Sequence, residues 1–213
     1  MRTRALLILT ATLLVASPLA WSIPSPSLDD GTDSSAPKAP ASVQDTATYN
    51  DALALMKKGD ELGTQDDARD AYGSARVKLQ SLVARSPQWA EAWNALGYTQ
   101  RKLGSYDDSL ASYAKALELK PGYPEALEYR GEAYLRLNRI KEAKQAYLDL
   151  FASNRRIAAT LLQSMQDWLK AQVSSHAVDA SVVTDLQQWV KERSQIATQT
   201  AALTREGTAA GWR

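Results

Sequence analysis

The most constraining feature of this 213-residue chain is that its central part repeats itself after 34 residues. Laying the stretch that begins at Ala90 over the stretch that begins at Pro124 brings identical residues into register. The identical pairs are Glu91 and Glu125, Ala92 and Ala126, Gly97 and Gly131, Leu103 and Leu137, and Tyr113 and Tyr147. A fixed period of this length is typical of proteins built from stacked copies of one small unit, because one copy alone cannot bury its apolar face.

Each copy is predicted to form two helices. From Thr48 to about Thr200, apolar residues recur at the i, i+3, i+4 and i+7 spacing of amphipathic helices, and the sustained alternation of strands is missing. Gly104 is placed to end the first helix of its copy in a left-handed conformation. Pro121, which lacks an amide donor, is placed to close the second helix. The sequence therefore predicts an all-α protein.

The copy at 90–121 carries a W-x2-L-G motif, followed by a small residue, an aromatic residue and a terminal proline. This pattern resembles the tetratricopeptide repeat, and residues 87–152 are similar to small exported bacterial proteins with such repeats. The resemblance implies helix-turn-helix repeats stacked as a right-handed α-solenoid. It also assigns packing positions, which are Trp93, Leu96, Gly97, Ser109, Tyr113, Ala116 and Pro121 in the first copy and Gly131, Tyr134, Ala143 and Tyr147 in the second.

The repeat domain is expected to span residues 48–155, with a divergent repeat at 48–87 before the clear repeats at 90–121 and 124–155. In the divergent repeat, Gly59 and Asp60 resemble the turn after the first helix. Residues 61–71 then form an insertion, which is either a lengthened second helix or a charged loop. Eleven residues make about three turns of α-helix, so a helical insertion would keep the packed face in register.

Two further apolar stripes follow the repeats, one from Ile157 to Leu169 and one from Val182 to Ile196. A stack of repeats leaves an apolar end that must be covered, so residues 156–200 are predicted to form a helical cap. Residues 201–213 are predicted to be a flexible tail.

The N-terminal residues 1–22 have the pattern of a secretory signal peptide, with Arg2 and Arg4 before an apolar run and small residues at a cleavage site. The apolar run would be only roughly 18 Å long as a helix, against about 30 Å of bilayer core, so no membrane span is expected in the mature chain. Residues 23–47, rich in Pro and Ser, are predicted to be a disordered linker. We expect export to the periplasm of a Gram-negative bacterium, with secretion or N-terminal anchoring as alternatives.

Composition excludes several kinds of chemistry. The chain has no Cys and one His, and its formal net charge is +1. Thiolate chemistry is therefore impossible, and no basic field is available to attract nucleic acid. His176 stands in a connection without a motif around it, and no phosphate-binding loop or nucleophile motif is present. We expect no catalytic residue, no metal and no cofactor.

In the tetratricopeptide repeat family, positions 2, 5, 9, 12 and 13 of each first helix line a concave groove. The resemblance therefore implies a partner-binding groove made by Glu91, Asn94, Tyr98, Arg101 and Lys102 from one repeat and by Glu125, Glu128, Glu132, Leu135 and Arg136 from the next. Such a mixed surface suits a peptide of alternating charge that is held by polar contacts around a few apolar anchors. The open alternative is that individual members of this set are merely solvated surface positions.

These observations lead to the hypothesis of a non-catalytic adaptor or scaffold in the bacterial cell envelope, which binds a peptide or protein segment in its groove. One alternative is a chaperone-like assembly factor that holds client proteins transiently. Another is an accessory subunit that regulates an envelope enzyme. The partner's identity does not follow from the residues.

Overall fold

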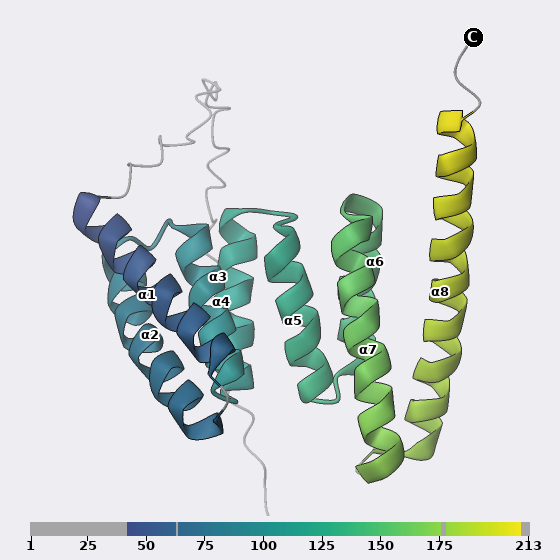
Figure 1. Cartoon of the computed structure of the whole chain (residues 1–213), viewed down its shortest axis with the longest axis horizontal. Coiled ribbons are helices and arrows are strands. Elements are labelled where there is room, and N and C mark those ends of the chain that lie inside the picture. Colours follow the sequence, from purple (N-terminus) through teal and green to yellow (C-terminus); the bar gives the residue numbers. More distant parts are fainter. Residues whose placement is uncertain (1–41, 63, 176–177, 210–213) are drawn as a thin grey trace, which may run out of the picture. The chain divides into compact units, whose positions relative to one another are not determined.

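The computed structural model describes residues 42–62, 64–175 and 178–209, and all regular structure in those ranges is α-helical. Its helices belong to one compact unit (Figure 1). They are α1 (Val43–Glu61), α2 (Gln65–Arg85), α3 (Ala90–Lys102), α4 (Tyr106–Leu119), α5 (Pro124–Arg136), α6 (Ile140–Ser153), α7 (Arg155–Ser175) and α8 (Ala180–Ala209). The predicted all-α class is confirmed.

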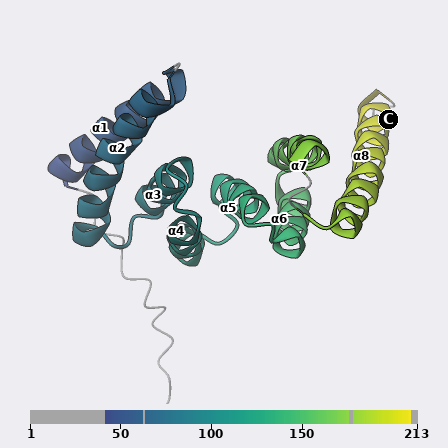
Figure 2. The same ribbon diagram turned by 90° about the horizontal axis from the view of Figure 1, so that it is seen from below.

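The helices pack in chain order as an α-solenoid. α1 packs on α2, α3 on α4 and α5 on α6, and the α2–α3 and α4–α5 contacts join each pair to the next. α3 also contacts α5, and α5 contacts α7, so the first helices of successive pairs are neighbours. Figure 2 shows α3, α5 and α7 following one another along one side, with α4 and α6 on the other.

Glycines allow the helices of this stack to approach closely. A Cβ atom on Gly97 would stand 2.6 Å from Cε1 of Tyr113, whose side chain is fully buried. Trp93 packs against the same cluster, which joins α3, α4 and α5. A Cβ atom on Gly131 would likewise stand 2.6 Å from Cδ2 of Leu161 on α7. The repeated glycine therefore marks a crossing point in both clear repeats, although its partner differs between them.

The turns inside the two clear repeats use the same backbone conformation. Gly104, after α3, has φ of +82°, and Asn138, after α5, has φ of +57°. These residues are 34 positions apart, and both lie in the left-handed region that glycine and asparagine adopt most readily. The turn is thus preserved although the residue type changes.

The first pair differs from the sequence prediction in two ways. α1 begins at Val43, within the stretch predicted as linker, because Ser42 caps it by accepting a hydrogen bond from the Asp45 amide at 3.0 Å. Gly59 and Asp60 lie inside α1 instead of forming a turn. A Cβ atom on Gly59 would stand 2.8 Å from Cζ of Tyr72, so Gly59 is the crossing glycine of this pair. The 61–71 region continues as helix from Gln65, which makes α2 21 residues long against 14 for α4.

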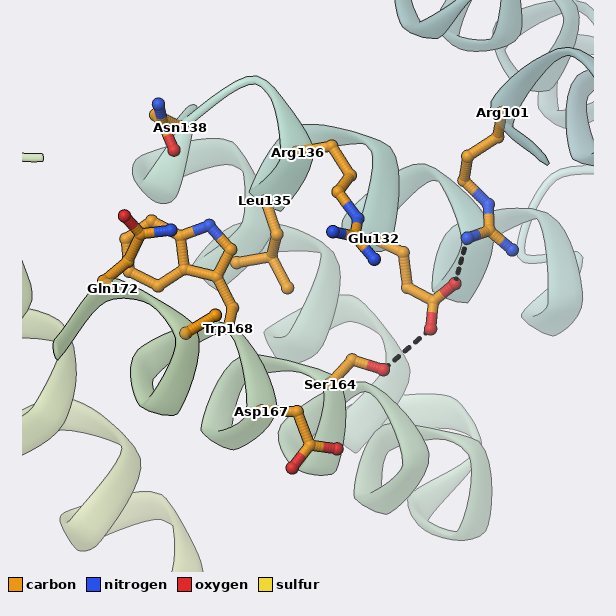
Figure 3. Close-up of a pocket in the computed structure, with 10 residues that line it drawn as sticks. Arg101, Glu132, Leu135, Arg136, Asn138, Ser164, Asp167, Trp168 and Gln172 are labelled. Atoms are coloured by element: carbon orange, nitrogen blue, oxygen red, sulfur yellow. Dashed lines mark hydrogen bonds and ion pairs between the residues drawn. The ribbon is translucent and has the colours of Figure 1, made fainter. Parts of the chain in front are cut away.

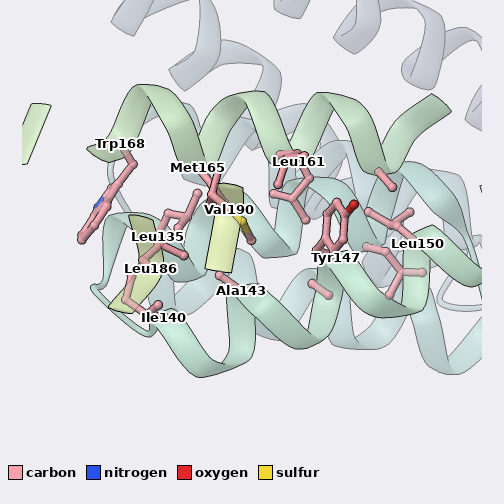
Figure 4. Packing of buried hydrophobic residues seen from close by; sticks show 14 of the residues in the cluster. Leu135, Ile140, Ala143, Tyr147, Leu150, Leu161, Met165, Trp168, Leu186 and Val190 are labelled. Atoms are coloured by element: carbon pink, nitrogen blue, oxygen red, sulfur yellow. The ribbon is translucent and has the colours of Figure 1, made fainter. Parts of the chain in front are cut away.

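The largest apolar core lies between α5, α6, α7 and α8 (Figure 4). Met165 of α7, Tyr147 of α6 and Leu186 of α8 are fully buried there. α7 packs on both α5 and α6. α8 covers this core with Leu186 and Val190, and its Trp189 ring meets the Tyr147 ring edge-on at 5.2 Å between centroids.

The C-terminal helix also runs further than predicted. α8 continues to Ala209, so residues 201–209 are helical where the sequence prediction has a flexible tail. The local sequence favours this extension, since Ala201, Ala202 and Leu203 are strong helix formers and no proline interrupts the segment. The signal peptide, His176 and all of the linker before residue 42 lie outside the described residues. Within the described ranges, no helix is long and apolar enough to cross a membrane.

Candidate functional site

Four of the predicted groove residues, Arg101, Glu132, Leu135 and Arg136, line one surface. We call it the A-face; it is made by the sides of α3, α5 and α7 that carry Arg101, Glu132 and Ser164. Arg101 Nη1 lies 2.8 Å from Glu132 Oε2, and Ser164 Oγ donates to Glu132 Oε1 at 2.7 Å (Figure 3). One carboxylate of α5 therefore joins α3 to α7. The ion pair connects position 12 of one predicted first helix with position 9 of the next.

Arg101 is held from several sides. Its side chain is only 13% exposed, and its guanidinium lies over the rings of Tyr98 and Tyr129, at 5.2 and 5.4 Å from their centroids. Burial of the guanidinium is the largest single effect and disfavours its charge, but Glu132, Tyr113 and Tyr98 together outweigh it and raise the pKa of Arg101. Arg101 is therefore a permanent, oriented cation in the wall of the A-face.

Tyr98 and Lys102 are engaged in contacts between repeats. Asp60 Oδ1 of α1 accepts hydrogen bonds from Tyr72 at 2.5 Å and from Tyr98 at 2.7 Å, and it lies 2.9 Å from Lys102 Nζ. Burial would raise the pKa of Asp60, but these three donors outweigh it and lower the pKa. Two of the predicted groove residues thus tie the divergent pair to the first clear repeat.

A cavity of about 490 Å³ opens on the A-face between α5 and α7. Four predicted groove residues line it, namely Arg101, Glu132, Leu135 and Arg136. The remaining lining residues are Asn138 from the turn after α5 and Ser164, Asp167, Trp168, Ala171 and Gln172 from α7. We call this cavity the Trp168 pocket, since the indole of Trp168 lies beside Leu135 in its wall (Figure 3).

The α7 contribution to this pocket was missed at the sequence level. The 157–169 stripe predicts only a cap, because the 34-residue identities fade after α6. Leu161, Met165 and Trp168 pack in the core, and Ser164, Asp167 and Ala171 reach the pocket. Polar residues beside an apolar stripe are expected on any surface helix, so the sequence carries no signal that distinguishes these pocket residues from a solvent face.

At the other end of the A-face lie two buried polar side chains, Glu128 and Asn94. Glu128 is 9% exposed and makes no hydrogen bond or ion pair with any other described residue. Burial together with Glu132 and Glu125 raises its pKa to about 7, while Arg101 and Arg156 act in the opposite direction. Asn94 is 8% exposed, and its Oδ1 atom has no hydrogen-bond donor within the described part of the chain.

The other predicted groove residues lie at the edges of this surface. Glu91 is half-buried and lies 3.2 Å from Lys120 Nζ, Glu125 is half-buried, and Arg136 is exposed at the pocket rim. Among the residues that the structure describes, no group of three or more His, Asp or Glu side chains is arranged to hold a metal ion. The surface therefore offers a pocket of mixed polar and apolar lining together with oriented charged groups.

Comparison with known proteins agrees with this geometry. Residues 97–138, which run from the crossing glycine of α3 to the turn after α5, match a family model described as TPR repeat. This part of the chain carries tetratricopeptide repeat sequence. Tetratricopeptide repeats are protein–protein interaction modules, and members of the family are typically non-catalytic.

One curated relative shows the extent of the sequence similarity. The tetratricopeptide repeat domain-containing protein PYG7 of Arabidopsis thaliana, a chloroplastic protein, is 28% identical over 116 residues, which are 52% of this chain and 38% of PYG7. The chain thus spans well under half of that curated relative's length.

Two solved structures are also similar. The first TPR domain of Spaghetti (RPAP3), solved with the HSP90 peptide SRMEEVD, has 22% identity and a TM-score of 0.38 over 56% of this chain and 94% of that chain. MamA has 18% identity and a TM-score of 0.42 over 72% of this chain and 84% of that chain.

Proposed function

We propose that this tetratricopeptide repeat protein is an exported, non-catalytic adaptor or scaffold of the bacterial cell envelope, which binds a peptide or protein segment on its A-face. The observation that carries the proposal is the Trp168 pocket, where an apolar wall made by Leu135 and Trp168 stands beside the Arg101–Glu132 pair. Apolar anchors surrounded by oriented polar groups are how grooves of this kind bind peptides.

The position of the pocket supports binding of a segment instead of a small ligand. The polar contacts of the A-face continue from α1 through α3 and α5 to α7, by way of Asp60, Tyr98, Arg101, Glu132 and Ser164. A surface that spans several repeats suits an extended chain segment, because successive side chains of the segment can contact successive repeats. Export is supported by the signal-peptide pattern of residues 1–22.

In-cell photocrosslinking tests the proposal. A photoreactive amino acid is placed at Arg136, which is exposed at the pocket rim, or at Glu118, which is exposed on α4 away from the pocket. We expect a discrete crosslinked species from position 136 and none from position 118. Arg136→Glu is compared with the matched charge reversal Lys141→Glu on α6, where we expect partner binding to be retained.

The same experiment separates the alternatives. An adaptor gives one partner at fixed stoichiometry, whereas a client-holding protein gives many weak crosslinks, and an accessory subunit changes a measurable enzymatic rate. Fractionation of the cells locates the product. Equal crosslinking from positions 136 and 118 would contradict binding on the A-face, and recovery of the chain in the cytoplasm would contradict export.

A further inference from the structure

The most unusual group on the A-face is the carboxylate of Glu128. The side chain is 9% exposed and has neither a hydrogen bond nor an ion pair to another described residue. Buried carboxylates are costly when ionised, and proteins pair them almost without exception. The Glu128 oxygens are not among the fully occluded polar atoms, so the carboxylate is reachable from the A-face and can accept a counter-group from outside the chain.

The helix geometry places Glu128 within the A-face. Glu128 lies one turn before Glu132 on α5, and residues four apart share one face of a helix. Since Glu132 contacts α3 through Arg101 and α7 through Ser164, the face that carries Glu128 lies between those two helices. Arg101 does not neutralise Glu128, because its guanidinium is paired with Glu132 at 2.8 Å.

Asn94 occupies on α3 the position that Glu128 occupies on α5, 34 residues later, and it is 8% exposed. Its side-chain oxygen is occluded and has no donor among the described residues, while its amide group interacts with the Tyr123 hydroxyl. As a neutral residue, Asn94 supplies no counter-charge to Glu128.

We propose that the bound segment carries a lysine or arginine whose cationic group enters the A-face at α5 and pairs with Glu128. This inference rests on the proposed function and specifies the chemistry of the partner. An acidic segment would place like charges beside Glu125, Glu128 and Glu132, and a wholly apolar segment would leave Glu128 without a counter-charge. The cation is therefore the group that this end of the surface requires.

The distance between Glu128 and the Trp168 pocket sets the separation of the basic and apolar residues in the bound segment. Glu128 and Leu135 are seven residues apart on α5, which is about 10 Å along the helix axis. An extended chain advances about 3.3 Å per residue, so an apolar side chain about three residues from the cation reaches the Trp168 pocket. The segment is expected to contain a basic residue and a large apolar residue at this separation.

The protonation of Glu128 supports the same assignment. With a pKa of about 7, Glu128 is partly protonated in the free chain at neutral pH, under the influence of Glu125, Glu132, Arg101 and Arg156. A bound cation would favour the ionised form and displace the proton. Affinity for a basic segment should therefore fall as the pH is lowered from 8 to 5.5, by about tenfold or more.

Phage display tests the inference. A random dodecapeptide library is selected against the purified wild-type chain and, in parallel, against Glu128→Gln, which keeps the size of the side chain and removes its charge. We expect wild-type selections to be enriched in Lys or Arg about three residues from an apolar residue, and Glu128→Gln selections to lose the basic residue. Glu118→Gln is the matched control, because Glu118 is exposed on α4. This variant should select the same peptides as wild type.

A synthetic peptide from the wild-type selection then gives the magnitude. Replacing its basic residue by norleucine should weaken binding to wild type by about tenfold or more, and binding to Glu128→Gln by less than about threefold. Equal losses for both proteins, or selections without basic residues, overturn the inference. In that case, sensitivity of the peptides to Arg136→Glu leaves the proposed function standing, whereas peptides insensitive to both variants, or no enrichment at all, overturn the proposed function as well.

Discussion

The ring of Tyr113 lies directly against the backbone of Gly97, so closely that a Cβ atom at Gly97 would stand 2.6 Å from Tyr113 Cε1. This contact brings α3 and α4 together, and Tyr113 has no exposed surface along which to withdraw. The crossing depends on the absence of one side-chain atom, which makes it a direct test of the packing.

Gly97→Ala is therefore predicted to lower the free energy of unfolding by about 1–3 kcal/mol, because the added methyl group overpacks the crossing. Gly73→Ala is the control, since Gly73 lies inside α2 and a Cβ atom there would meet no other atom within 4 Å. That control is expected to stabilise by about 0.5–1 kcal/mol, the usual gain for glycine to alanine in a helix. Urea unfolding measures both, and equal effects would show that the crossing is not close-packed.

The Arg101–Glu132 ion pair is predicted to couple the two clear repeats. Both side chains are largely buried, at 13% and 22% exposed, so a double-mutant cycle with alanine should give a coupling of about 1–2 kcal/mol in unfolding free energy. The exposed Lys115–Glu118 pair within α4 should give only about 0.3–0.5 kcal/mol in a parallel cycle. Similar coupling energies for the two pairs would show that the Arg101–Glu132 pair does not stabilise the contact between the two clear repeats.

Glu128 is predicted to make stability depend on pH. Its pKa of about 7 in the folded chain exceeds the ordinary value of 4.5, so the folded state binds the proton more tightly than the unfolded state. The resulting stabilisation is complete below about pH 4.5 and is lost as the pH rises through 7. At pH 8, the free energy of unfolding of Glu128→Gln should therefore exceed that of wild type by about 1–3 kcal/mol. At pH 4.5 the two free energies should differ little.

Unfolding curves of both proteins across this pH range provide the check. Glu118→Gln is the matched control, since Glu118 is exposed on α4. A wild type that gains stability relative to Glu128→Gln as the pH rises would mean that the carboxylate is well solvated or paired.

Much of the fold follows from the 34-residue register alone. The register identifies Gly97 and Gly131 as equivalent, and it places Asn138 opposite Gly104 in the turn. The residue types at the helix ends then account for where the helices stop, since Gly104 and Asn138 both adopt the left-handed conformation. These features depend on residues close in sequence or one period apart, which is why they can be predicted.

The first pair and α7 could not be predicted in the same way. Gly59 resembles a turn residue in the sequence, whereas its role is set by contact with Tyr72 across the lengthened pair. α7 joins the A-face because Leu161 fills the space over Gly131, a contact between residues 30 positions apart without a repeated motif. The state of Glu128 likewise depends on what α3 and α7 place around it, and single-sequence periodicity does not contain that information.

The central claim is that partner segments bind the A-face, and hydrogen–deuterium exchange tests it most directly. The chain is compared with and without a saturating phage-selected peptide, and the exchange of each helix is followed by mass spectrometry. The account predicts slower exchange in α5 and α7 and unchanged exchange in α4 and α6. Protection confined to α4 and α6, with α5 and α7 unchanged, would contradict it.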